Sequence, residues 1–182
     1  MLSTFSEFEF SLNEINHRVL KKGDGAQPAV LIIQELPGVT KETLALADRL
    51  HQDGFTIYLP LLLGEPNCNY EPLKNLVRLC ISKEFRFLNQ RQSSPITHYL
   101  RALCRHMQTE CDGEPVGAIG MCFSGGFVLS LMIDESVAAP VMTQPAPIIH
   151  SLIDSLQNLL LVFLKKNLSP RNNVLNVTIF YS

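Results

Sequence analysis

The sequence places a cysteine at the junction of a strand-like and a helix-like segment. Residues 116–126 read VGAIGMCFSGG, an apolar run followed by Cys122 and then by a helical pattern. This arrangement is similar to a nucleophile elbow, a sharp strand-to-helix turn that presents a reactive side chain at the carboxyl end of a sheet. Gly120, two positions before the apex, would avoid a clash in the strained turn. The positive end of the helix dipole favours a thiolate, so we predict that Cys122 is a nucleophile.

Other residues around the elbow have predicted roles as well. The backbone N–H of Phe123 could donate to an oxyanion, and the small residues Ser124, Gly125 and Gly126 would let the helix pack closely on the strand. Ser124 is a rival apex, but it would put Cys122 where a glycine is wanted. The alternative for Cys122 itself is a small buried hydrophobe, the usual fate of a free cysteine. We expect that fate for the other cysteines, which lie outside any strand-turn-helix context: Cys68, Cys80, Cys104 and Cys111.

A second candidate segment follows the apolar run Ala29–Ile33 and reads QELPG. Loops at the carboxyl ends of neighbouring parallel strands converge on one crevice, so Glu35 could meet the elbow. There its carboxylate could bond the Cys122 thiol and control its ionisation, while the N–H of Leu36 is a candidate second oxyanion donor. The alternative, that Glu35 is a solvated turn residue, is equally compatible with the sequence.

The elements that would position these residues alternate between strand-like and helix-like patterns from about residue 29 onward, which predicts a mostly parallel sheet with helices on both faces. Residues 5–19 are typical of an antiparallel hairpin at a sheet edge. Thr40 and Ser94 are expected to cap helices, and Pro95 fits the first helical position. The predicted strands are 29–33, 55–59, 116–120, 137–143 and 174–181, and the predicted helices are 40–54, 72–80, 94–107, 125–132 and 148–165.

Composition limits the class of protein. The 182 residues are 46% apolar with a formal net charge of -2, which fits a single domain and gives no basic excess for nucleic acid or a membrane surface. We therefore expect a small-molecule ligand.

The five cysteines are widely spaced without a C-x-x-C pair, as in reduced thiols of a cytoplasmic protein. The beginning of the sequence has no signal-peptide pattern and no apolar run could span a membrane. No motif implies a metal or an organic cofactor.

Several ordered motifs together resemble the dienelactone hydrolase family, over about residues 8–147. They are QELPGV at 34–39, CISKEF at 80–85, Ser94-Pro95 before a helix, and GMCFSGG at 120–126. Members of that family are α/β-hydrolases that open an enol-lactone or cleave related esters through a cysteine thiolate. The resemblance implies that Cys122 is the nucleophile, that Glu35 handles its proton, and that Leu36 and Phe123 supply the oxyanion-hole amides. It implies a small ester or lactone as substrate.

The resemblance stops before the rest of a triad, which in this fold follows the nucleophile in the order acid, then histidine. Residues 148–182 form a divergent segment, and the candidates after the elbow are Asp134, His150 and Asp154. We expect Asp134 to be solvated at a helix end, whereas His150 could approach Cys122 as a base. The expectation is a hydrolase impaired by an incomplete triad; the alternative is a non-catalytic binding or regulatory domain that keeps the reactive thiol. An uncovered sheet edge would favour self-association.

Overall fold

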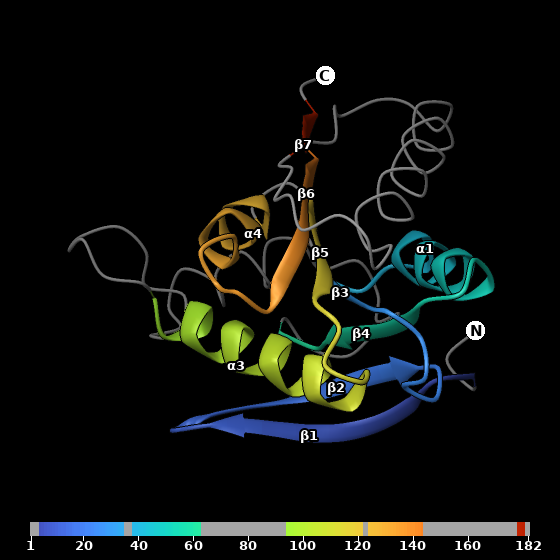
Figure 1. Cartoon of the computed structure of the whole chain (residues 1–182), viewed down its shortest axis with the longest axis horizontal. Coiled ribbons are helices and arrows are strands. Elements are labelled where there is room, and N and C mark those ends of the chain that lie inside the picture. The colour runs from blue at the N-terminus through green and yellow to red at the C-terminus, as the bar shows by residue number, and fades with distance from the viewer. Residues whose placement is uncertain (1–3, 35–37, 63–93, 122–123, 144–177, 181–182) are drawn as a thin grey trace.

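The computed structural model describes residues 4–34, 38–62, 94–121, 124–143 and 178–180, which form a sheet with helices on both faces (Figure 1). The strands are β1 (Ser6–Leu12), β2 (Ile15–Lys22), β3 (Ala29–Ile33), β4 (Thr56–Pro60), β5 (Val116–Met121), β6 (Val137–Thr143) and β7 (Thr178–Phe180). The helices are α1 (Lys41–Gln52), α3 (Pro95–Glu110) and α4 (Gly125–Leu131). The predicted mostly parallel sheet with helices on both faces is confirmed.

The strands lie in the order β1-β2-β4-β3-β5-β6-β7. β1 and β2 form an antiparallel hairpin, and β2 is antiparallel to β4. The remaining neighbours are parallel. The hairpin therefore lies at one edge of the sheet, as its alternating sequence predicts, and β7 lies at the other. Among the described residues no further strand pairs with β7, so self-association through this edge stays a prediction.

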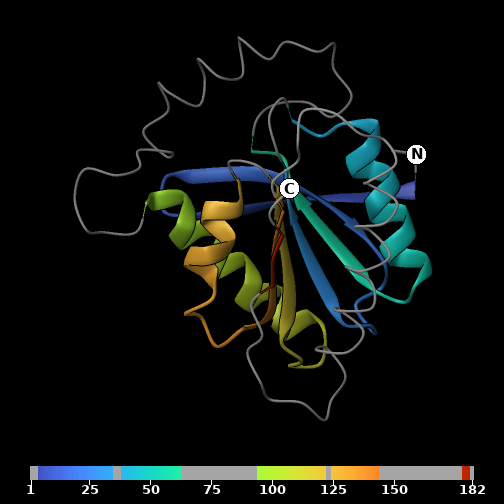
Figure 2. The same ribbon diagram turned by 90° about the horizontal axis from the view of Figure 1, so that it is seen from above.

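Each face of the sheet carries its own apolar core. Figure 2 shows α1 on one side of the strands and α3 with α4 on the other. Alternate residues of β3 separate accordingly: Val30 and Ile32 belong to the core under α1, whereas Leu31 belongs to the core under α3 and α4. All five residues of β3 are buried. Continuous burial on both faces explains why this strand is an unbroken apolar run.

The two long helices begin where their caps predict. The Thr40 hydroxyl accepts a hydrogen bond from the N–H of Thr43 in a reciprocal capping box, and the Ser94 hydroxyl accepts from the N–H of Thr97. Gly54, at φ 92, follows the end of α1 in the left-handed region that glycine favours. α3 runs to Glu110, one turn beyond its predicted end. The predicted helices 72–80 and 148–165 lie outside the described residues.

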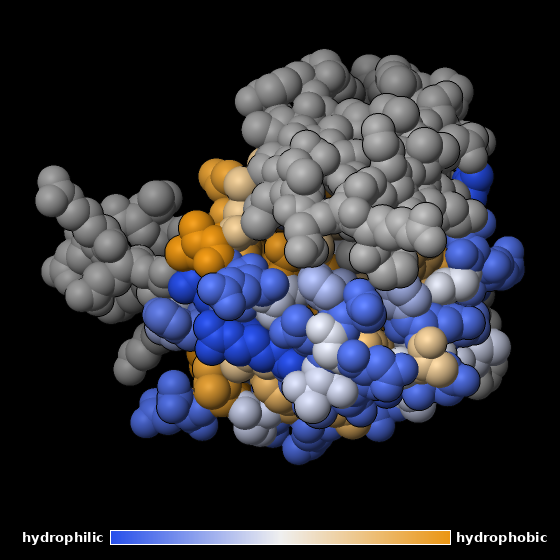
Figure 3. Space-filling model, in the orientation of Figure 1, coloured by the Kyte–Doolittle hydropathy of each residue, from blue (hydrophilic) through white to orange (hydrophobic). Residues whose placement is uncertain are grey.

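Two large apolar side chains are exposed in α4 and just after it. Leu129, in α4, is 52% exposed, and Ile133, in the turn that follows the helix, is 78% exposed. Figure 3 shows apolar side chains gathered on the side of the molecule where α4 lies. Separately, none of the described helices has the length and apolar character needed to cross a bilayer.

Candidate active site

The turn between β5 and α4 depends on the absence of a side chain at Gly120. A Cβ built there would lie 2.6 Å from the carbonyl oxygen of Ser124 and 2.6 Å from Cγ2 of Val128. Such distances force the backbone or the neighbouring side chain to move, so only glycine fits. This confirms the steric reason predicted for Gly120. The same reason does not extend to Gly126, which has open space around the position of a Cβ.

Ser124 closes the turn from its helix side. Its hydroxyl oxygen accepts a hydrogen bond from the N–H of Met121 at 2.8 Å. The same oxygen lies 2.8 Å from the carbonyl oxygen of Met121 and 3.1 Å from that of Ile33. The hydroxyl proton is donated to these two carbonyl oxygens. Ser124 is fully buried. Its hydroxyl thus holds residues 121 and 124 together and ties the elbow to β3, so Ser124 is a structural residue and not a rival apex.

The two segments that are predicted to carry the chemistry follow neighbouring parallel strands, β3 and β5. In the parallel pairing of β3 with β5, Ile33 is opposite Gly120. One step further along each chain come Gln34 and Met121, which directly precede Glu35 and Cys122. The structure therefore brings the flanks of both segments together at the carboxyl end of the sheet, where ligands of open α/β sheets bind.

The predicted chemical residues themselves fall outside the described part of the chain. They are Glu35, Leu36, Cys122, Phe123 and His150. Their roles stay predictions. The structure describes residues next to the first four of them in the chain, among which are Gly120, Ser124 and Ile33.

Gln34 is a feature that sequence reasoning missed. Its side chain has no exposed surface, and neither its amide oxygen nor its amide nitrogen is hydrogen-bonded to any of the described residues. A buried primary amide normally has partners for its two N–H donors and its carbonyl acceptor. The available sequence signal was a polar residue directly after a continuous apolar strand.

Asp134 corrects a prediction. It is 6% exposed rather than solvated, and its carboxylate accepts hydrogen bonds from the Ser136 hydroxyl at 2.7 Å and from Arg105 at 2.8 Å. Burial alone would raise the pKa of Asp134, but the bonds from Ser136 and Arg105 outweigh it and lower the pKa. The residue stabilises the turn that leads into the amino end of β6. That end of the sheet is opposite the elbow, so Asp134 is excluded as a triad acid.

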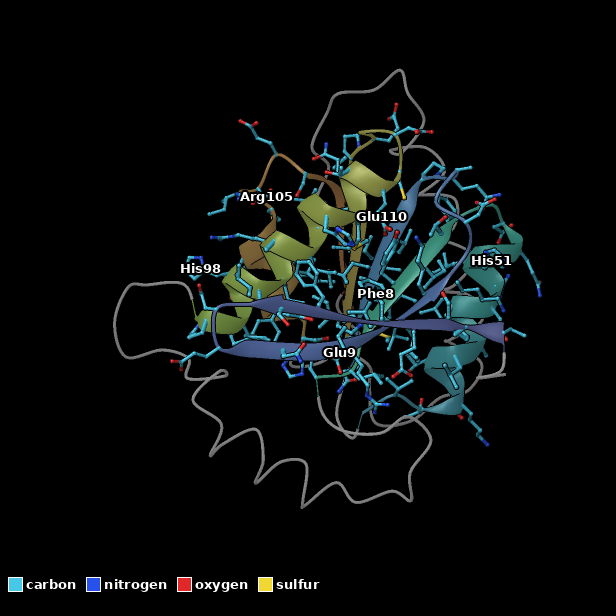
Figure 4. The ribbon with its side chains drawn as sticks, turned by 90° about the horizontal axis from the view of Figure 1, so that it is seen from below. Phe8, Glu9, His51, His98, Arg105 and Glu110 are labelled. Atoms are coloured by element: carbon cyan, nitrogen blue, oxygen red, sulfur yellow. The ribbon has the colours of Figure 1, made fainter. Side chains whose placement is uncertain are left out.

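Three of the four histidines in the described part of the chain pack within the fold. His51 Nδ1 lies 3.1 Å from the carbonyl oxygen of Phe55, and the His17 ring packs edge-on against Tyr99. His106 stacks on Phe10 with ring centroids 5.3 Å apart. His98 is exposed on α3, on the opposite side of the molecule from His51 (Figure 4). The packing of His17, His51 and His106 gives these residues structural roles, whereas His98 lies on the surface.

A charged cluster joins α3 to the strands away from the elbow. The buried Tyr58 hydroxyl donates to Oε2 of Glu110 at 2.6 Å, and Lys21 Nζ lies 3.1 Å from the same oxygen. Burial, with the bond to Glu110, raises the pKa of Tyr58. Partial burial opposes ionisation of Glu110, but the bonds from Tyr58 and Lys21 prevail and lower its pKa. The cluster is a structural clamp between α3, β2 and β4.

The thiols in the described part of the chain are those of Cys104 and Cys111, both free and buried. Burial raises the pKa of each. This confirms their predicted structural role, while Cys68 and Cys80 lie outside the described residues. Within the described ranges, no group of three or more His, Cys, Asp or Glu side chains is placed to hold a metal ion.

Comparisons with known proteins agree with this architecture. Residues 17–162 match the sequence model of the dienelactone hydrolase family. A human carboxymethylenebutenolidase homolog is 26% identical over 130 residues, which cover 70% of this chain and 50% of the relative. The chain therefore spans about half the length of that curated relative.

Solved structures show the same fold at low sequence identity. A putative dienelactone hydrolase from Klebsiella pneumoniae superimposes with a TM-score of 0.57 at 17% identity, covering 81% of this chain and 62% of that structure. An epoxide hydrolase from Vigna radiata has a TM-score of 0.55 at 14% identity, with 87% and 47% covered.

Proposed function

Because the chain belongs to the dienelactone hydrolase family, we propose that it reacts with a small carboxylic ester or lactone through the thiolate of Cys122. The observation that carries this proposal is the turn around residue 122. Gly120 has no room for a side chain, and the Ser124 hydroxyl is hydrogen-bonded to the backbone of Met121 and of Ile33. Fixed residues on both sides of a reactive thiol favour the pre-organisation that nucleophilic catalysis needs.

The proposed step is transfer of an acyl group to sulfur. The thiolate attacks the carbonyl carbon, a C–S bond forms, and the C–O bond to the alcohol portion breaks. The leaving alkoxide takes a proton, for which Glu35 is the proposed carrier. The backbone N–H groups of Leu36 and Phe123 would stabilise the oxyanion. β3 and β5 are parallel neighbours, so the chain leaves both strands at the same end of the sheet. This geometry supports the assignment.

Turnover requires a second step, in which water attacks the acyl-enzyme with the help of a base. His150 is the one histidine after Cys122 in the 182 residues, and we propose it as that base. Loss of general-base assistance typically slows a reaction by roughly 10²–10⁴-fold. Hydrolysis impaired at this step would leave an acylated protein. A binding or regulatory domain with a reactive thiol is the alternative.

The test is a time course with excess p-nitrophenyl acetate on the purified chain, beside Cys122→Ser, Glu35→Gln and His150→Gln. Release of p-nitrophenolate beyond one equivalent that requires both Cys122 and His150 would establish a hydrolase. A single-equivalent burst, with an acetyl group located on Cys122 by mass spectrometry, would establish acyl transfer without turnover and favour the binding domain. Release that persists in Cys122→Ser would refute the proposal.

A reducing, cytoplasmic location belongs to the same proposal. Its support is the free thiols of Cys104 and Cys111, together with the need for a reduced Cys122 in the chemistry. No metal or organic cofactor has a part in the proposed step.

A further inference from the structure

The buried amide of Gln34 lacks a partner among the described residues, and this is the starting point of the inference. The side chain is 0% exposed, so bulk solvent does not reach its polar atoms. An apolar side chain of similar size would avoid the cost of desolvating an amide without replacing its hydrogen bonds. Gln34 therefore lowers the stability of the free protein. Groups retained at such a cost are concentrated at sites where a ligand later satisfies them.

The position of Gln34 identifies the site. Residues of β3 alternate between the two cores, and Gln34 is the next position after Val30 and Ile32 on the face that carries α1. Met121, the last residue of β5, is one step beyond the last residue of β5 that pairs with β3, and it packs against the same core. Gln34 directly follows β3 and Met121 ends the neighbouring β5, and each directly precedes a residue of the proposed chemistry. The Ser124 hydroxyl fixes this junction through the carbonyl oxygen of Ile33.

We propose that Gln34 is a substrate-binding residue, whose amide nitrogen donates a hydrogen bond to an oxygen of the acyl group that Cys122 accepts. This inference rests on the proposed function and adds a specificity determinant to it. A hydrogen bond formed away from water discriminates strongly, because a ligand that lacks the matching oxygen leaves the amide unpaired. Gln34 would thus favour acyl donors, whose carbonyl oxygen can accept this bond, over thiol reagents that lack a carbonyl oxygen.

A second residue provides a matched control. Thr56, at the start of β4, is also fully buried, and its hydroxyl oxygen makes no hydrogen bond to the described part of the chain. It lies at the amino end of the sheet, opposite the elbow. Thr56→Val and Gln34→Leu each remove a buried polar group that has no partner among the described residues, and both should raise the midpoint of thermal unfolding. Only Gln34→Leu should change the chemistry.

The experiment compares wild type, Gln34→Leu and Thr56→Val in two reactions of Cys122. The first is acylation by p-nitrophenyl acetate, and the second is modification by methyl methanethiosulfonate, which has no acyl oxygen. We expect Gln34→Leu to slow acylation roughly ten- to hundredfold, the loss of one buried hydrogen bond, and to leave the second reaction unchanged. Thr56→Val should leave both reactions unchanged.

Three results would overturn the inference while the proposed function stands. They are unchanged acylation in Gln34→Leu, equal slowing of both reactions, and a fall in thermal stability of both Gln34→Leu and Gln34→Met, which would reveal a structural partner of the amide. Wild-type protein that is not acylated on Cys122 would instead refute the proposed function, and the inference with it.

Discussion

At Gly120, a single hydrogen in place of a side chain permits the strand-to-helix turn. The nearest obstacle to a methyl group is the backbone oxygen of Ser124, which cannot rotate away as a flexible side chain could. We expect Gly120→Ala to lower the free energy of unfolding by about 1–3 kcal/mol, the usual cost of overpacking. Urea denaturation monitored by circular dichroism would measure the change.

Gly126 supplies the control for that substitution. It lies in α4, with open space around the position of a Cβ. Alanine there should stabilise the protein by about 0.5–1 kcal/mol, because it restricts the unfolded chain and favours the helix. If both alanine variants had the same stability, the close approach at Gly120 could not be the reason for its glycine.

At the scale of the elements, α3 is attached to the sheet by a polar clamp within an apolar interface. Tyr58 of β4 and Lys21 of β2 both bond the Glu110 carboxylate at the end of α3. Hydrogen bonds to a charged group contribute about 1.5–3 kcal/mol each. We expect Tyr58→Phe to lower the free energy of unfolding by about this amount while the ring stays packed.

A double-mutant cycle with Glu110→Gln separates this bond from the packing of the ring. The combined variant should lose less stability than the sum of the single variants. Strict additivity would show that the Tyr58 hydroxyl and Glu110 act independently. The clamp lies away from the elbow, so the rate of Cys122 acylation should not change in any of the folded variants.

At the scale of the whole molecule, local patterns predicted the elements and missed the contacts between them. The apolar run of β3 and the caps Thr40 and Ser94 are signals within one segment, so the sequence revealed them. The bond from Tyr58 to Glu110 joins residues 52 positions apart. Only the sheet register and the docking of α3 create it.

The prediction for Asp134 failed for the same reason. A helix-end aspartate is usually solvated, but here Arg105 reaches it from another helix and Ser136 from the following turn. The Ser124 hydroxyl likewise bonds Ile33, 91 positions earlier. The roles of Cys122, Glu35, Leu36, Phe123 and His150 were predicted from motif resemblance and await direct tests.

These long-range contacts make the stability of the whole molecule sensitive to acid. The pKa values of Asp134 and Glu110 are lowered in the folded protein. Each group therefore contributes stability that is fully present above its unfolded pKa, about 3.9 for Asp and 4.3 for Glu. That contribution is lost as the pH falls through the folded value, because the unfolded chain then binds more protons.

We expect the free energy of unfolding to fall as the pH is lowered below about 4.5, and the fall to be smaller in Asp134→Asn. At neutral pH this variant should already be less stable by about 1–3 kcal/mol, since the bonds from Ser136 and Arg105 lose a charged acceptor. Asp112→Asn is the matched control, because Asp112 is exposed and its φ of 56 suits asparagine equally well. Urea titrations between neutral and acidic pH would measure the three proteins. An acid dependence in Asp134→Asn as steep as in wild type would show that the buried carboxylate does not govern it, and would assign the effect to Glu110 and the remaining carboxylates.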